Sequence, residues 1–142
     1  MRSESGFTLI EIVVVLVIIA GLVAIVAPNL MKRLSDSNLK ITRAKISNVE
    51  TALKLFKVDN GFYPETQQGL QALIEYPNTG REPKNWKGPY LEKNVIPKDA
   101  WNNEFIYIGP DQTGDGMYTV ISSGEDGVAN NDDDLSSRDI EQ

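Results

Sequence analysis

A single apolar stretch near the amino terminus limits the folds that this chain can adopt. Residues 7–27 are long and apolar enough to cross a bilayer as one helix, and Glu11 is the one charged residue among them. On translocon scales an acidic side chain at mid-membrane costs roughly 2.5–3.5 kcal/mol, so such residues usually have a partner. The stretch therefore predicts a membrane helix with a carboxylate that needs a cation.

The residues before this stretch suggest a source for that cation. Cleavage after Gly6 would create an ammonium group at Phe7, which could pair with the Glu11 carboxylate of a neighbouring copy. One alternative is an ordinary signal-anchor helix in which the acidic residue is incidental. Another is a secretory signal peptide, whose apolar core is shorter, at about 7–15 residues. Its removal would leave a mature chain that begins near Pro28.

The composition excludes several classes of function. The chain of 142 residues can hold one membrane helix and a soluble domain of about a hundred residues. It contains neither cysteine nor histidine. This excludes a disulfide framework, zinc sites built from His or Cys, and nucleophilic catalysis of the Ser-His-Asp or Cys-His type.

Charge is unevenly distributed along the chain, whose net charge is −6. Residues 32–57 are mainly basic, whereas residues 111–142 are strongly acidic and hold one base, Arg138. The basic segment is interpreted as the solvated face of a helix, in preference to a nucleic-acid-binding surface. Copies stacked head to tail would bring the two segments together, which electrostatic complementarity favours. Lys32 and Arg33 follow the apolar stretch closely, so the positive-inside rule alone does not settle the orientation.

The helix is predicted to continue beyond the apolar stretch. Pro28 should kink or loosen it, because proline removes one backbone donor. Further on, apolar residues recur at spacings of three and four, which indicates one apolar stripe on a helix surface. The stripe consists of Ile46, Val49, Ala52, Leu53 and Phe56. Residues 59–61 then form a stop signal, in which Gly61 suits a left-handed C-cap.

After the long helix, the sequence predicts a short helix and an irregular segment. Thr66 can cap the short helix at its amino end. The apolar face of this helix consists of Leu70, Leu73 and Ile74. Residues 80–97 read as irregular, with Trp86 and Tyr90 as anchors against the core.

Two strands are predicted next, at residues 104–108 and 117–121, joined by a hairpin loop at residues 109–116. The acidic turn within that loop is interpreted as a hairpin turn, in preference to a metal site, because Asp and Gly tolerate the dihedral angles that such a turn requires. The fold class is therefore α+β, with a long amino-terminal helix packed on a small carboxyl-terminal domain of a short helix and antiparallel strands.

The first eleven residues resemble the start of a type IV pilin-like prepilin. The resemblance rests on a short leader ending in Gly6, followed by Phe7-Thr8-Leu9-Ile10-Glu11. It implies that a membrane peptidase cuts between Gly6 and Phe7 and methylates the new amino terminus. It also implies that Glu11 guides the docking of subunits.

Four further segments narrow the resemblance to the major pseudopilins of the type II secretion system. The segments are residues 61–73, 86–91, 97–101 and 122–127. Together with the leader they span nearly the whole chain in the family's order. Two departures are Ala100, where the family often has proline, and Ser123, where leucine is common.

The resemblance implies a division of the chain into four parts. Residues 1–6 are the leader, and residues 7–27 are the membrane-spanning segment that becomes the filament core. Residues 28–60 are the amphipathic continuation of the helix, and residues 61–142 are the periplasmic domain.

The acidic segment at residues 126–134 is the candidate metal site. Calcium takes six to eight oxygen ligands in flexible geometry, and carboxylates and carbonyls of a loop that folds back can supply them. The spacing is not that of an EF-hand. Without the family, a disordered acidic tail and a calcium loop are equal alternatives. The family resemblance implies a structural calcium in a loop at residues 122–136. The ligands implied are side chains of Asp126 and of the run Asp132, Asp133 and Asp134, with the carbonyls of Ser123 and Val128.

The function implied is structural and not enzymatic. Mature copies would leave the bacterial inner membrane, where the domain faces the periplasm, and polymerise into a pseudopilus that helps to drive folded exoproteins across the outer membrane. The implied partners are further copies, minor pseudopilins, the prepilin peptidase and the inner-membrane assembly platform, with no nucleic acid. One alternative is a type IV pilus subunit for adhesion, motility or DNA uptake. Another is a membrane-anchored calcium-dependent hydrolase.

Overall fold

The structure is a computed structural model that describes residues 6–140. Of the predicted leader, residues 1–6, only Gly6 lies within the described part. The chain divides into two compact units, Met1–Ser37 and Asn38–Gln142. The second unit contains the strands and the short helices, so it holds the predicted α+β domain.

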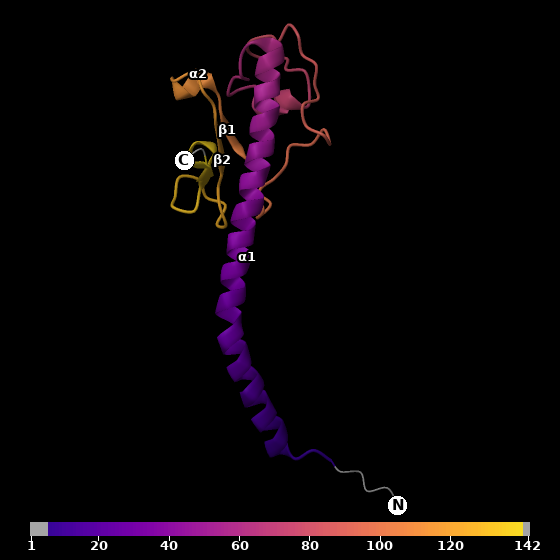
Figure 1. The fold of residues 1–142 in the computed structure, drawn as a ribbon, viewed down its shortest axis with the longest axis vertical. Coiled ribbons are helices and arrows are strands. Elements are labelled where there is room, and N and C mark those ends of the chain that lie inside the picture. Colours follow the sequence, from indigo (N-terminus) through magenta and orange to yellow (C-terminus); the bar gives the residue numbers. More distant parts are fainter. Residues whose placement is uncertain (1–5, 141–142) are drawn as a thin grey trace, which may run out of the picture. The chain divides into compact units, whose positions relative to one another are not determined.

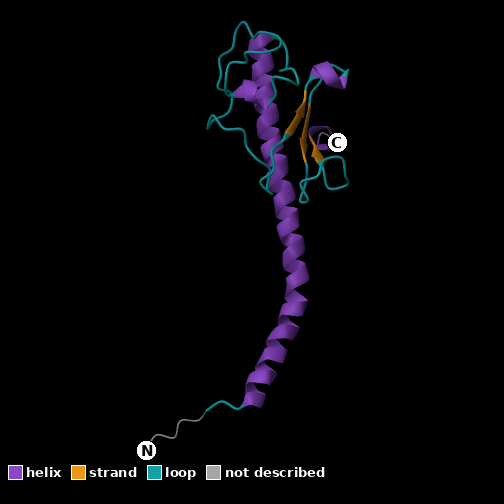
Figure 2. Cartoon of the chain, turned by 180° about the vertical axis from the view of Figure 1, so that it is seen from behind, coloured by secondary structure: helices purple, strands orange, loops and turns teal. Residues whose placement is uncertain are grey.

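One long helix, α1 (Leu9–Asn60), begins in the first unit and ends in the second, as predicted (Figure 2). Pro28 lies inside α1 and does not end it, because a proline removes one hydrogen bond of the many that hold a long helix. The helix stops at the predicted signal. Gly61 has a φ of +83° and donates its N–H to the carbonyl oxygen of Lys57 at 2.7 Å. This confirms the left-handed C-cap, a conformation that glycine adopts without a steric penalty.

The core of the second unit forms around one face of α1. The predicted apolar stripe is buried along its whole length, from Ile46 to Phe56. Phe56 packs edge-on against Phe62 and Tyr90, with ring centroids 5.7 and 5.6 Å away. Edge-to-face pairs of this kind add about 0.5–1.5 kcal/mol each to the burial of the rings. The helix is therefore held to the rest of the unit by aliphatic and aromatic packing.

Replacing Phe56 with alanine should strongly destabilise the second unit. Its side chain is fully buried and contacts two rings, so its loss leaves a cavity that costs about 3–5 kcal/mol. The matched control is Leu55→Ala, since Leu55 is next in the helix but 50% exposed. Urea denaturation followed by circular dichroism should show a much lower midpoint for Phe56→Ala alone. Equal midpoints for the two variants would contradict the assignment of the core face.

The strands form one antiparallel sheet beside α1. Its members are β1 (Ile106–Ile108), β2 (Thr119–Ser122) and β3 (Leu135–Ser136), in the order β1-β2-β3. In the second unit, the sheet lies on one side of α1 and most of residues 70–100 lie on the other (Figures 1 and 2). The two predicted strands are confirmed in shortened form. β3 was not predicted, because two residues cannot display an alternating pattern.

The predicted hairpin loop at residues 109–116 is wrong in one respect, since it contains a short helix. This helix, α2 (Pro110–Thr113), has proline in its first turn, and it is followed by Gly114 in the left-handed conformation. Proline suits the first helical position and glycine suits the residue after the end, so local chemistry favours a helical turn over an open loop.

The prediction that Thr66 caps a short helix is also wrong. The element that follows is a single 3-10 turn, η1 (Leu70–Leu73), whose N-cap residue is Gly69. Thr66 instead binds Asp111: its N–H and its hydroxyl donate to the Asp111 Oδ1 at 2.7 and 2.9 Å. The hydroxyl oxygen accepts the N–H of Gly109 at 2.9 Å. This long-range contact occupies the group that a cap would need.

The irregular segment is anchored as predicted. The indole N–H of Trp86 donates to the carbonyl oxygen of Ala72 at 3.0 Å, and its ring meets that of Tyr90 edge-on. The Tyr90 backbone N–H donates to the carbonyl oxygen of Leu73 at 2.7 Å. Both aromatic residues therefore hold the loop against the core next to η1.

Candidate functional site

The first unit presents an unusual apolar surface. Among the described residues, α1 is the one helix long and apolar enough to cross a membrane. The large apolar side chains from Phe7 to Val26 are 47–83% exposed in the single chain. Soluble monomers rarely expose contiguous apolar surface of this extent. Lipid or other copies of the chain are therefore needed to cover it.

Glu11 lies in the first turn of α1, where it forms a capping box with Thr8. The Glu11 Oε2 accepts the Thr8 backbone N–H at 2.8 Å and the Thr8 hydroxyl at 2.9 Å. In return, the Thr8 Oγ1 accepts the N–H of Glu11 at 3.3 Å. These bonds satisfy donors that a helix start would otherwise leave unpaired. The spacing Thr-x-x-Glu is the sequence signature of this cap, a role of Glu11 that was not predicted from the sequence.

The predicted cleavage site lies just before this capping box. Gly6 and Phe7 are in non-helical backbone, and the Phe7 side chain is 82% exposed. The bond between them is therefore outside the helix. The cation predicted to pair with Glu11 would belong to a neighbouring copy, so it is not part of a single chain.

The acidic loop, defined here as residues 123–134, joins β2 to β3 and is folded by its own carboxylates. Asp133 Oδ2 accepts the N–H groups of Glu125 and Asp126 at 2.8 and 3.3 Å. Asp126 accepts the N–H of Val128 at 2.8 Å and the side-chain amide of Asn131 at 2.7 Å. The loop therefore folds back on itself and brings Asp126 and Asp133 to one turn.

Asp134 contributes to a neighbouring turn of the same loop. Its Oδ2 accepts the N–H of Asn130 at 2.6 Å, whereas its Oδ1 is buried and has no hydrogen-bond partner in the described part of the chain. Asp132 and Val128 are exposed, and Ser123 is buried at the loop's start. Within residues 6–140, no three carboxylates are grouped as a ready-made metal site. The structure thus brings part of the predicted ligand set together.

Two polar residues that were not predicted as site residues, Asp99 and Asn103, hold the base of this loop. Asp99 is 2% exposed, and its Oδ2 accepts the hydroxyl of Ser122 at 2.7 Å. The side-chain amide of Asn103 donates to the carbonyl oxygen of Gly124 at 2.9 Å. Asp99 lies in the segment at residues 97–101 that carries the family resemblance, but its partner was not predictable, because both contacts join segments more than twenty positions apart.

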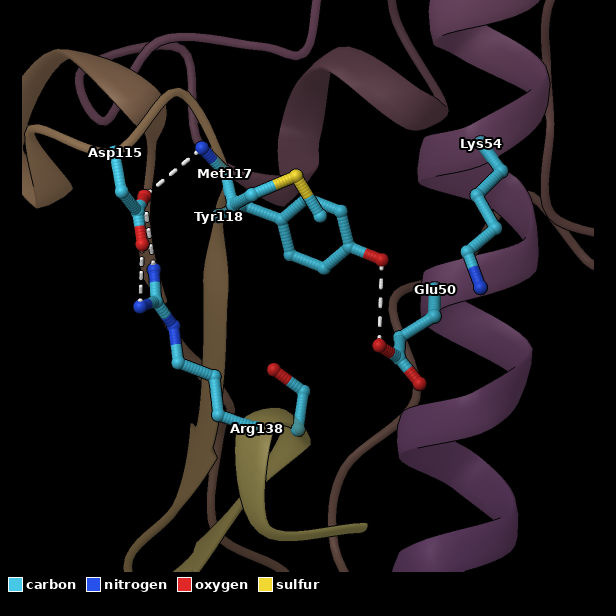
Figure 3. A pocket seen from close by; sticks show the side chains of 7 residues that line it. Glu50, Lys54, Asp115, Met117, Tyr118 and Arg138 are labelled. Atoms are coloured by element: carbon cyan, nitrogen blue, oxygen red, sulfur yellow. Dashed lines mark hydrogen bonds and ion pairs between the residues drawn. The ribbon is translucent and has the colours of Figure 1, made fainter. Parts of the chain in front are cut away.

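A cavity of about 210 Å³ in the second unit lies between α1 on one side and residues 115–118 and 137–138 on the other (Figure 3). On its wall the Tyr118 hydroxyl donates to Glu50 Oε1 at 3.3 Å. Opposite, Arg138 donates to Asp115 at 2.7 Å, and this guanidinium lowers the pKa of the Asp115 carboxyl to about 2. The Ser137 hydroxyl oxygen accepts the N–H of Val120 at 3.1 Å. These polar groups of the cavity wall bind one another. Two of the bonds attach α3 (Ser137–Ile140) to β2 and to Asp115.

A membrane-length apolar helix that begins with a capped glutamate and continues into a small α+β unit defines the class of pilin-like filament subunits. Residues 1–27 match the prokaryotic N-terminal methylation motif, and residues 29–141 match the family of type II secretion system protein G. The chain therefore belongs to the protein G family, the major pseudopilins of the type II secretion system.

Relatives cover almost the whole chain. It is 41% identical over 136 residues to the type II secretion system core protein G of Pseudomonas aeruginosa, covering 94% of each chain. The core protein G of Aeromonas hydrophila is 38% identical over 135 residues, covering 94% of this chain and 92% of its own.

A solved structure shows the same fold. The crystal structure of the major pseudopilin from the type 2 secretion system of enterohaemorrhagic Escherichia coli matches with a TM-score of 0.67 at 31% identity. The match covers 78% of this chain and 94% of that one. These relatives confirm the predicted function, a structural pseudopilus subunit, over the pilus and hydrolase alternatives.

Proposed function

We propose that this chain, once cleaved between Gly6 and Phe7, polymerises from the inner membrane into a short helical pseudopilus. The observation that carries the proposal is the apolar surface of the first unit, which a filament core made of many such helices would cover. Heterologous contacts that do not close on themselves generate open filaments of this kind. Growth of the filament would help to move folded exoproteins across the outer membrane.

Glu11 would set the register between copies in this proposal. Its carboxylate already accepts donors from Thr8 through one oxygen, Oε2. A carboxylate has about four lone-pair sites, so the capping box is compatible with a second partner. The ammonium of Phe7 from a neighbouring copy would supply the cation that a membrane carboxylate needs.

The proposed location is the bacterial inner membrane, with the second unit in the periplasm. The membrane-length apolar helix and the methylation motif support this arrangement. The proposed partners are further copies, minor pseudopilins, the prepilin peptidase and the inner-membrane assembly platform. The chain itself would perform no catalysis.

A structural calcium in the acidic loop completes the proposal. The buried Asp134 Oδ1, which lacks a hydrogen-bond partner in the described part of the chain, fits a cation as its missing partner. Gly124 supports the fit, because a side chain at that position would collide with the Asp133 carboxylate. Asp126, Asp133 and Asp134 would hold the ion, with carbonyl oxygens of Ser123 and Val128 and a contribution from Asp132. The ion would neutralise neighbouring carboxylates, so its binding energy would stabilise the folded loop.

Intact-mass and amino-terminal analysis of mature protein, purified from cells that contain the prepilin peptidase, should find a methylated Phe7 as the first residue. The exposed, non-helical backbone at Gly6 and Phe7 leaves this bond accessible. Electron micrographs of the same overexpressing cells should show filaments. A Gly6→Val control should keep the leader and form none. A mature chain that begins near Pro28 would contradict the anchor assignment.

A further inference from the structure

The carboxylate of Asp99 is buried at the base of the acidic loop and is held there by backbone and hydroxyl donors. Asp99 Oδ1 accepts the backbone N–H groups of Trp101 and Asn103 at 3.0 and 2.7 Å. Its Oδ2 accepts the Ser122 hydroxyl at 2.7 Å. Burying a charge is expensive unless hydrogen bonds compensate for lost water. Three donors converge here, and hydrogen bonds to an ionised acceptor are about twice as strong as neutral ones.

The partners of Asp99 lead directly into the acidic loop. The Ser122 hydroxyl donates to Asp99 and, as an acceptor, takes the N–H of Gly124 at 3.4 Å. Asn103, whose N–H binds Asp99, donates its side-chain amide to the Gly124 carbonyl oxygen at 2.9 Å. Both peptide groups of Gly124 are therefore held by residues that Asp99 orients. Gly124 in turn lies against the Asp133 carboxylate.

The same turn is tied to α1 on its other side. The Lys45 ammonium donates to the Asp99 carbonyl oxygen at 3.2 Å. The backbone N–H of Ala100 donates to the hydroxyl oxygen of Thr42, which is fully buried, at 3.1 Å. A continuous set of hydrogen bonds thus runs from α1 through Asp99 to the first turn of the acidic loop.

We propose that Asp99 is the positioning residue of the acidic loop: through Ser122 and Asn103 it holds the first turn in the conformation that binds calcium. The inference rests on the calcium site proposed above and assigns no direct contact between Asp99 and the ion. Partners that orient metal ligands matter for affinity almost as much as the ligands do. The same network of hydrogen bonds would then support calcium binding and attach the loop to α1.

Asp99→Asn separates positioning from folding. The amide oxygen can still accept the N–H groups of Trp101 and Asn103, so the turn at residues 99–103 is retained. The amide nitrogen takes the place of Oδ2 and can only donate. The Ser122 hydroxyl must then accept this hydrogen bond instead of donating one, which changes its hydrogen bond with the N–H of Gly124. The substitution therefore acts on the loop side of the network.

Titration calorimetry with calcium chloride on the purified full-length chain in detergent micelles tests the proposal. Calcium affinity should fall about tenfold to a hundredfold in Asp99→Asn, the range found when partners of metal ligands are changed. Asn103→Ala should weaken affinity similarly and serves as the second variant if Asp99→Asn does not fold. The matched control is Tyr107→Phe, which loses a buried hydrogen bond of 2.7 Å to the carbonyl oxygen of Pro64. This control should lower the melting temperature and leave calcium affinity unchanged.

The outcomes separate this inference from the calcium proposal on which it rests. Wild-type binding with unchanged affinity in Asp99→Asn and Asn103→Ala would overturn the role of Asp99 and leave the calcium site intact. Equal losses of affinity in these variants and in Tyr107→Phe would also overturn it, because general destabilisation would then explain the result. A wild-type chain that binds no calcium would overturn both.

Discussion

Replacing Glu11 with alanine is expected to abolish filament assembly, although the chain is still cleaved and inserted into the membrane. Removing the lone carboxylate makes the helix cheaper to keep in lipid by roughly 2.5–3.5 kcal/mol on translocon scales. At the same time, the variant loses the group proposed to attract the ammonium of Phe7 in a neighbouring copy. Both effects oppose the transfer of a subunit from the bilayer into the filament.

Cysteine cross-linking can measure this loss cleanly, because the chain has no native cysteine. A pair of cysteines introduced on the exposed apolar surface of the first unit should give a ladder of cross-linked oligomers in the wild-type background. The Glu11→Ala background should give monomers only. A normal ladder in that background would refute the docking role.

The capping box requires a control that separates charge from helix capping. Glu11→Gln keeps an oxygen that can accept the Thr8 donors but removes the charge. Thr8→Val keeps the carboxylate but removes the hydroxyl from the box. If charge pairing drives docking, Glu11→Gln should fail to assemble and Thr8→Val should assemble, at reduced yield. The reverse pattern would assign Glu11 a role within its own helix.

Chelation of calcium, or Asp126→Ala, is expected to lower the melting temperature of the second unit and abolish secretion. A ligand present at a hundredfold excess over its Kd stabilises a fold by about 2.7 kcal/mol. For a domain of about this size, each kcal/mol shifts the melting temperature by roughly 4–8 °C. The expected loss is therefore about 10–20 °C. The substitution adds a local cost, because Asp126 also accepts hydrogen bonds from Val128 and Asn131.

Differential scanning calorimetry of the full-length chain, with calcium and with EDTA, provides the measurement. Asp139→Ala is the matched control, because Asp139 is an exposed acid outside the acidic loop. It should melt as the wild type does in both conditions, and it should support secretion. A wild-type melting temperature that is identical in calcium and EDTA would remove the calcium proposal.

The parts of the fold that were predicted correctly depend on patterns within one segment. The apolar residues of α1 recur at helical spacing, so their shared face was predictable without knowing what covers it. Gly61 was predictable as the C-cap because a left-handed cap needs a positive φ, which glycine adopts without a steric penalty. The β-branched and aromatic residues of β1 and β2 likewise marked both strands, although not their ends.

The errors have a different origin. Thr66 carries a valid N-cap signal, yet folding brings Asp111 within 2.9 Å of its hydroxyl, and the distant partner takes the group. β3 exists only because its two residues meet the end of β2, as Ser122 pairs with Leu135. A two-residue strand has no pattern of its own. Its existence depends on where its neighbour lies.

By itself, the sequence determined the membrane-length helix, the carboxylate of Glu11 near its start, the cap at Gly61 after its end, and the buried apolar stripe from Ile46 to Phe56. These features follow from hydrophobic periodicity and from the conformational preferences of single residues. Only the tertiary structure decided that Asp99 holds the base of the acidic loop and that Thr66 binds Asp111. A hydroxyl or carboxylate can satisfy several donors or acceptors equally well, and only the folded chain determines which of them it meets.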